Sequence, residues 1–110
     1  MTIKEPFQET RRHKLLPKSI ANKIPKLYAT EEIKSKDKKI YVKFFSPYSN
    51  YTWYVAEYDG KDTFFGFVNG AYPEWGYFSL SELANANRNG LPLVERDKYF
   101  NPKKFSSIKI

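Results

Sequence analysis

The sequence predicts an α+β fold in one domain, built as a three- to four-stranded antiparallel meander with two short flanking helices. Three runs rich in aromatic and β-branched residues follow one another at 40–45, 51–58 and 63–68. Such runs are typical of strands, and the connections between them at 47–50 and 59–62 are too short for a crossover helix. Neighbouring strands are therefore expected to run antiparallel.

A short helix is expected before the sheet. Its apolar residues recur at spacings of four, four and three, which places them on one helix face: Leu16, Ile20, Ile24 and Leu27. Pro17 suits the first turn, and Pro25 disfavours helical geometry at the residue before it. This helix is therefore expected to end near Lys23 or Ile24.

A second helix is expected after a fourth strand at 76–79. Ser79 and Glu82 have the spacing of a capping box ahead of Leu83, which marks the start of a helix. This helix is expected to end by Asn89-Gly90. With both helices packed on one face of the sheet, the opposite face and its loops are expected to form the binding surface.

The two ends of the chain differ from its centre. Residues 1–13 mix charge with Pro6 and show no helical or strand period, so we expect a basic flexible arm there and one α+β domain over 14–110. Residues 91–94 are expected to dock on the sheet edge. Residues 95–110 read as irregular chain.

Composition narrows the function classes. The chain has 110 residues and no cysteine, which excludes a disulfide framework, a thiol nucleophile and zinc sites built on thiolates. No apolar run approaches the ~20 residues that span a bilayer, and the first residues lack the apolar stretch of a secretory signal. We expect a cytoplasmic protein that needs no membrane, metal or cofactor.

Positive charge is concentrated at both ends of the chain. Residues 1–43 carry twelve Lys and Arg against five Asp and Glu, residues 44–97 carry three against seven, and residues 98–110 carry four lysines and no acid. This asymmetry suggests a polyanion or an acidic partner surface, although lysine-rich loops are often only solvated. The basic candidates for such a contact are Arg11, Arg12, Lys14, Lys34, Lys36, Lys38, Lys39, Arg88 and Arg96.

Few residues suit catalysis. The single histidine, His13, lies in the arm, where a solvated side chain is expected. Glu57, Asp59 and Asp62 bracket one hairpin and could divide acid and base roles or hold a metal, but turn carboxylates mostly serve solubility. A metal-independent nuclease built on Glu95 and its neighbours stays open as an alternative, and no Gly-rich phosphate loop occurs.

Aromatic density is the strongest signal in the sequence. Fifteen Phe, Tyr or Trp residues fall between 41 and 78, more than the inner face of one small sheet can absorb, so some are expected to face outward. Aromatic side chains are enriched at protein interfaces and also stack on nucleic-acid bases. The aromatic candidates for partner contact are Tyr48, Tyr51, Tyr54, Tyr72 and Trp75.

One run matches part of a known RNA-binding motif. Phe65-Gly66-Phe67-Val68 corresponds to the centre of the aromatic stacking motif of RNA-recognition domains. That fold places a helix between its first two strands, whereas residues 47–50 leave space only for a turn. We therefore reject that fold and keep base stacking as a separate hypothesis.

Several segments together resemble a known family. They are Leu27–Glu32, Val42–Pro47, Trp53–Tyr54, Gly76–Leu83, Leu91–Asp97 and Tyr99–Phe100. In this order they are similar to the family catalogued as domain of unknown function twenty-nine fifty-eight, over about two thirds of the chain. Members of that family are typically encoded on bacterial plasmids, conjugative elements and phages, and the resemblance implies such an origin here. It assigns no catalytic residue.

These observations favour a binding protein over an enzyme. The leading hypothesis is a mobile-element protein that docks on a host nucleic-acid-handling protein or ribonucleoprotein and inhibits it, as an anti-CRISPR protein inhibits an RNA-guided nuclease; this step is analogy. The alternative is direct binding of RNA or single-stranded DNA, with rings stacked on bases and Lys and Arg on phosphates.

Overall fold

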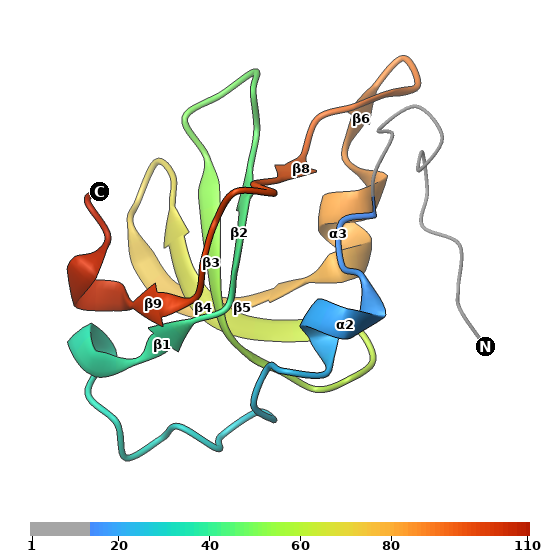
Figure 1. Ribbon diagram of the computed structural model, residues 1–110. Helices are drawn as coiled ribbons and strands as arrows, with labels where there is room; N and C mark the ends of the chain where they lie inside the picture. The colour runs from blue at the N-terminus through green and yellow to red at the C-terminus, as the bar shows by residue number, and fades with distance from the viewer. Residues whose placement is uncertain (1–13) are drawn as a thin grey trace.

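Five strands form one antiparallel sheet in the computed structural model, which describes residues 14–110 (Figure 1). Their order across the sheet is β5, β4, β3, β2, β8. Their bounds are β2 Val42–Phe45, β3 Thr52–Tyr58, β4 Thr63–Asn69, β5 Glu74–Ser79 and β8 Glu95–Arg96. The broad α+β class and the meander of four consecutive strands are confirmed. A fifth strand, β8, extends the sheet beyond the expected number.

Short elements surround this sheet. The helices are α2 (Lys18–Ala21), α3 (Leu80–Asn85) and the 3₁₀ turns η1 (Ser35–Asp37) and η2 (Phe105–Ser107). Two ribbons of two-residue strands complete the fold: β1 (Lys39–Ile40) with β9 (Lys103–Lys104), and β6 (Asn87–Arg88) with β7 (Leu91–Pro92). None of the helices described for residues 14–110 has the length and apolarity that a membrane crossing requires.

The main core lies between the sheet and the two α-helices. Phe44, Val55 and Phe64 project from neighbouring strands and are fully buried. Leu15 from the segment before α2 and Leu83 from α3 cover them. Figure 1 shows α2 and α3 on the same side of the sheet, as expected from the sequence. Burial of this apolar surface is the main stabilising term for a chain of this size.

The opposite face of the sheet is partly covered by the C-terminal segment. Phe105 of η2 packs against Phe67 at a ring-centroid distance of 4.8 Å and against Trp75 at 4.9 Å. Phe100 and Ile108 pack on the same small cluster, which includes the buried Tyr54. The expectation of an irregular tail was wrong here, because the aromatic residues of the tail find apolar partners on β3, β4 and β5.

The helix α2 is shorter than expected, whereas α3 begins and ends within its expected limits. The hydrogen bonds at the end of α2 reach back only three residues, from Lys23 N to Ile20 O and from Ile24 N to Ala21 O, so the chain continues in tighter turns toward Pro25. The capping box of α3 is confirmed, since Ser79 Oγ accepts from Glu82 N at 3.1 Å.

The helix α3 ends before Asn89-Gly90, as expected, and this segment forms the turn of a hairpin. Both residues have positive φ, 53° at Asn89 and 84° at Gly90, the geometry of a two-residue hairpin turn. They connect β6 and β7, whose pairing places Arg88 opposite Leu91. The expected docking of residues 91–94 on the sheet edge was wrong in register, because Glu95 and Arg96 make that pairing with Phe45 and Phe44.

The Asp59-Gly60 hairpin is confirmed. Asp59 Oδ1 accepts hydrogen bonds from the amides of Lys61, Asp62 and Thr63 at 2.7, 2.8 and 3.0 Å. Desolvation opposes ionisation, but these three backbone donors outweigh it and lower the pKa of Asp59 below its ordinary value. Gly60 supplies the positive φ of 83° that the turn requires.

Two glycines that face each other in the sheet provide a test of its packing. A Cβ at Gly66 in β4 would lie 1.8 Å from the carbonyl oxygen of Tyr54, whereas nothing lies within 4 Å of a Cβ at Gly76 in β5. We expect Gly66→Ala to lower the free energy of unfolding by about 3 kcal/mol, because the backbone of β3 would have to move. Gly76→Ala is expected to change it by less than about 0.5 kcal/mol. Urea unfolding measures both, and equal losses would contradict this register.

Candidate functional site

Six exposed lysines lie on two distant segments of the chain that pair with each other. In the β1–β9 ribbon Lys39 lies directly opposite Lys104, and Ile40 lies opposite Lys103. Figure 1 shows these two strands side by side, away from the α-helices. The turns η1 and η2 pack against each other beside them, and Phe105 N donates to Lys38 O at 2.8 Å. We call this surface the lysine ribbon: Lys34, Lys36, Lys39, Lys103, Lys104 and Lys109.

The lysine ribbon carries little neutralising charge. Asp37 is the one acidic residue between 33 and 40, and residues 98–110 contain none. Among residues 14–110, Lys43 forms an ion pair with Asp97 at 3.9 Å, and this pair lies outside the lysine ribbon. Like charges directly opposite each other across two strands destabilise the pairing. Lys39 and Lys104 are in that arrangement, so an anion placed on them would relieve repulsion.

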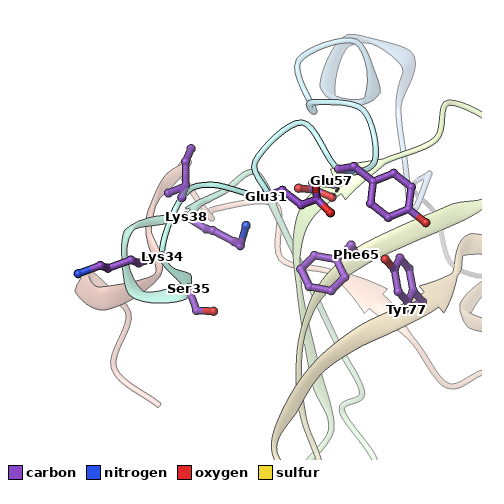
Figure 2. A pocket seen from close by; sticks show the side chains of 9 residues that line it. Glu31, Lys34, Ser35, Lys38, Glu57, Phe65 and Tyr77 are labelled. Carbon is purple, nitrogen blue, oxygen red and sulfur yellow. Dashed lines mark hydrogen bonds between the residues drawn. The ribbon is translucent and has the colours of Figure 1, made fainter.

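A pocket of about 470 Å³ opens beside the lysine ribbon (Figure 2). Loop residues before and within η1 form one wall, and β3, β4 and β5 form the other. Its lining residues are Tyr28, Glu31, Ile33, Lys34, Ser35, Lys38, Glu57, Phe65 and Tyr77. Lys34 belongs both to the pocket and to the lysine ribbon, so the two surfaces are continuous.

The carboxylate of Glu57 fixes the loop wall of this pocket to the sheet. Glu57 is 3% exposed and accepts from Tyr28 N at 2.8 Å, from Thr30 N at 3.0 Å and from the Thr30 hydroxyl. Tyr28 has a left-handed backbone with φ of 70°. Such a conformation at a tyrosine costs about 1–3 kcal/mol and persists where the surroundings hold it. Glu57 supplies that restraint.

Lys38 is part of the pocket and not of the exposed surface. Its exposed fraction is 6%, and its Nζ donates to the carbonyl oxygen and to Oγ1 of Thr30, the latter at 2.8 Å. The ammonium also lies 5.9 Å from the centre of the Phe65 ring. The expectation that Lys38 belongs with its lysine neighbours on the surface was wrong, because Thr30 and the pocket draw its side chain inward.

Two tyrosines meet at the pocket. Tyr77 of β5 is 55% exposed, and Tyr28 is exposed as well. The hydrogen bond between Tyr77 and Tyr28 is the main cause that raises the pKa of the Tyr77 hydroxyl, since the protonated hydroxyl donates this bond. Phe65 lies next to Tyr77, with ring centroids 5.1 Å apart.

A second set of exposed rings lies at the tips of two hairpins. Tyr48 and Tyr51 belong to the β2–β3 connection, and Tyr72, 84% exposed, belongs to the β4–β5 connection. The tips are neighbours, because a Cβ at Gly70 would lie 2.3 Å from the Tyr51 ring. We call Tyr48, Tyr51 and Tyr72 the tyrosine tips.

Other aromatic candidates are not available to a partner in the same way. Tyr54 is 3% exposed, so its expected place on the surface was wrong. Burial is the main cause that raises its pKa, and the charge of Asp97 adds to it. Trp75 is half-buried against Phe65, Phe67 and Phe105. Both side chains pack under the C-terminal segment.

The remaining basic candidates are scattered. The Arg96 guanidinium donates to the carbonyl oxygens of Lys14 and Leu15, which ties the start of the described chain to β8. Arg88 is exposed in the β6–β7 hairpin. Lys14 is half-buried. Arg11, Arg12 and His13, together with the expected arm over residues 1–13, lie outside the described residues.

The candidate carboxylates serve separate local roles. Asp59 caps its own turn, Asp62 accepts from the amide and hydroxyl of Ser81 at 2.8 and 2.7 Å, and Glu57 holds the pocket loop. Among residues 14–110, no group of three or more His, Cys, Asp or Glu side chains is placed to hold a metal ion.

Sequence reasoning missed part of both surfaces. Lys103 and Lys104 were visible as charges of an acid-free tail, but nothing local indicated their pairing with β1. Tyr28, Thr30 and Tyr77 were missed for a similar reason, since the hydrogen bonds that connect the loop to Glu57 span 27 to 29 residues.

A family model matches nearly all of the described residues and so shows the family of the chain. The family model described as Protein of unknown function (DUF2958) matches residues 15–109. The chain belongs to this family. The resemblance seen in separate sequence segments is thereby confirmed, and the match covers the sheet, the pocket and the lysine ribbon together. No curated protein and no solved structure matches the chain.

The role of Glu57 in building the pocket can be measured. Glu57→Gln replaces one acceptor oxygen by an amide that cannot accept from Thr30. We expect the free energy of unfolding to fall by about 2–3 kcal/mol, and hydrogen-exchange protection of the Tyr28 and Thr30 amides to be lost. Glu31→Gln, on the exposed rim, is the matched control and is expected to change neither. Retained protection in Glu57→Gln would contradict this role.

Proposed function

We propose that this protein binds single-stranded nucleic acid, RNA or DNA, without catalysing a reaction on it, and that the lysine ribbon is the contact surface. The observation that carries the proposal is the cross-strand pairing of Lys39 with Lys104 beside further exposed lysines. A fold gains no stability by placing like charges opposite each other. A phosphate backbone lying along the ribbon neutralises them and releases its own counterions.

Exposed rings near the lysine ribbon support a single strand over a duplex. Tyr99 is 89% exposed shortly before β9, and Tyr77 and Phe65 border the adjoining pocket. Bases of a single strand are free to stack on aromatic side chains, which adds affinity with little dependence on sequence. In a duplex the base faces are already stacked on each other and cannot use these rings.

Neutralising the ribbon tests the proposal. We expect Lys39→Gln with Lys104→Gln to weaken binding of a labelled single-stranded oligonucleotide about 20-fold at 0.1 M salt, because two phosphate contacts and their counterion release are lost. The slope of log affinity against log salt is expected to shrink by about 1.4. Fluorescence anisotropy over a salt series measures both quantities.

A charge-matched variant serves as the control for this experiment. Lys18→Gln with Lys23→Gln removes the same charge from exposed positions at α2, on the other side of the sheet. It is expected to leave the salt slope unchanged. If both double variants weaken binding equally, net charge and not the ribbon is responsible, and the proposed surface is wrong.

A second candidate function rests on the tyrosine tips. Three exposed tyrosines on adjoining hairpins, with Tyr51 against Trp53 at 5.7 Å between ring centroids, form the kind of surface that anchors protein interfaces. This observation supports a protein-docking function, and the docking that we propose is that of a mobile-element protein on a host nucleic-acid-handling protein or ribonucleoprotein, which it inhibits. An RNA-guided defence nuclease is the partner class that the origin of the family suggests.

Capture from a bacterial lysate distinguishes the second candidate. If it holds, tagged protein retains a specific nucleic-acid-handling protein after nuclease treatment, and Tyr48→Ala with Tyr72→Ala loses it while the Lys39 and Lys104 double variant keeps it. Loss of every captured protein on nuclease treatment would contradict docking and would leave direct binding as the function.

A further inference from the structure

The pocket beside the lysine ribbon has an aromatic wall that a planar ligand can contact. Phe65 and Tyr77 contribute neighbouring rings from β4 and β5, tilted by 58° to each other. Figure 2 shows both rings on the side of the pocket opposite Lys38 and Ser35. The cavity volume of about 470 Å³ lies within the range of small-ligand sites, about 300–1,000 Å³.

Its polar groups include a buried hydrogen-bond donor. Lys38 points its ammonium toward the pocket, while Lys34 points away from it (Figure 2). Two of the three ammonium protons are used on Thr30. Among the described residues, the third has only the ring of Phe65, 5.9 Å away. A buried ammonium with an unused proton favours a ligand oxygen within reach.

Acceptors lie on both walls of the pocket, Glu57 on β3 and Glu31 in the loop before η1. The two oxygens of Glu57 offer about four acceptor positions, and the loop uses three of them. Glu31 adds a second carboxylate at the exposed rim. The pocket therefore presents one donor beside free acceptor capacity.

The charges of the pocket select against ionic ligands. Glu31 and Glu57 repel a phosphate or carboxylate, and the Lys38 ammonium repels a cation. A neutral planar group that has one acceptor beside one donor meets neither repulsion. Phosphates attached to such a group would lie outside, where Lys34 begins the lysine ribbon.

We infer that this pocket receives one unstacked nucleobase of the bound strand, and that it selects bases with a ring carbonyl next to a ring N–H: uracil, thymine or guanine. This inference rests on the proposed function. The base stacks on Phe65 and Tyr77, its carbonyl accepts from Lys38, and its ring N–H donates to Glu57 or Glu31. Cytosine presents a bare acceptor nitrogen toward the carboxylates and leaves them unpaired, which penalises it.

Two homopolymers of equal length and charge test the selection. We expect the protein to bind oligouridine about tenfold more tightly than oligocytidine, and Tyr77→Ala to abolish that preference by removing one stacking ring. Leu91→Ala, at an exposed apolar position of β7 that does not line the pocket, is the control and is expected to keep it. Lys38→Met is expected to abolish the preference as well. If Lys38→Met unfolds the protein because Lys38 is buried, Tyr77→Ala still tests the pocket on its own.

The outcomes separate the pocket from the ribbon. Equal affinity for the two polymers, or an undiminished preference in Tyr77→Ala, overturns the pocket inference, while salt-dependent binding that needs Lys39 and Lys104 leaves the proposed function standing. A loss of preference in Leu91→Ala also overturns it, because the effect of Tyr77→Ala would then not be specific to the pocket. Failure of the wild-type protein to bind either polymer overturns both.

Discussion

The hydrogen bonds of the buried Glu57 carboxylate are the interaction on which the proposed binding surfaces depend. The carboxylate holds a loop far upstream in the chain against the third strand of the sheet, and it does so through two backbone amides and one hydroxyl. Without it, Tyr28 would leave its left-handed conformation and Thr30 would no longer draw Lys38 inward. The same bonds therefore support the fold and orient the polar groups of the pocket. The carboxylate thus connects β3 to the loop at Tyr28 and Thr30 through hydrogen bonds.

The C-terminal segment has an equally double role. Phe105 inserts among Tyr54, Phe67 and Trp75, and this packing brings Lys103 and Lys104 alongside β1. Burial of the aromatic rings stabilises the docked tail, because the rings contribute a large apolar area. This stabilisation offsets the repulsion between the lysines, which solvent and salt partly screen. The proposed binding surface is thus assembled only when the tail is docked. Charge and packing are coupled in one short stretch of chain.

Much of the central sheet could be predicted because its signals are local. The turn chemistry of Asp59-Gly60 and the capping box at Ser79 act over a few residues, and the aromatic runs are long enough to be read as strands. The ribbons β1–β9 and β6–β7 have two-residue strands, too short to show a period. Their pairing, like the bonds from Glu57 to Thr30, joins residues distant in sequence. The positive charge of the tail was visible in the sequence, but its location in space was not.

The opposed lysines of the β1–β9 ribbon also affect how the protein responds to its solvent. Most folded surfaces lose a little stability as salt screens their ion pairs. The pair Lys39 and Lys104 is repulsive, so added salt screens an unfavourable interaction there and the tail should dock more firmly as ionic strength rises. At high ionic strength the tail would be well ordered, but the protein would attract a nucleic-acid strand only weakly. In dilute salt the proposed attraction of a nucleic-acid strand would be strongest, and docking of the tail would be weakest. A bound strand would then stabilise the docked tail by neutralising the opposed lysines.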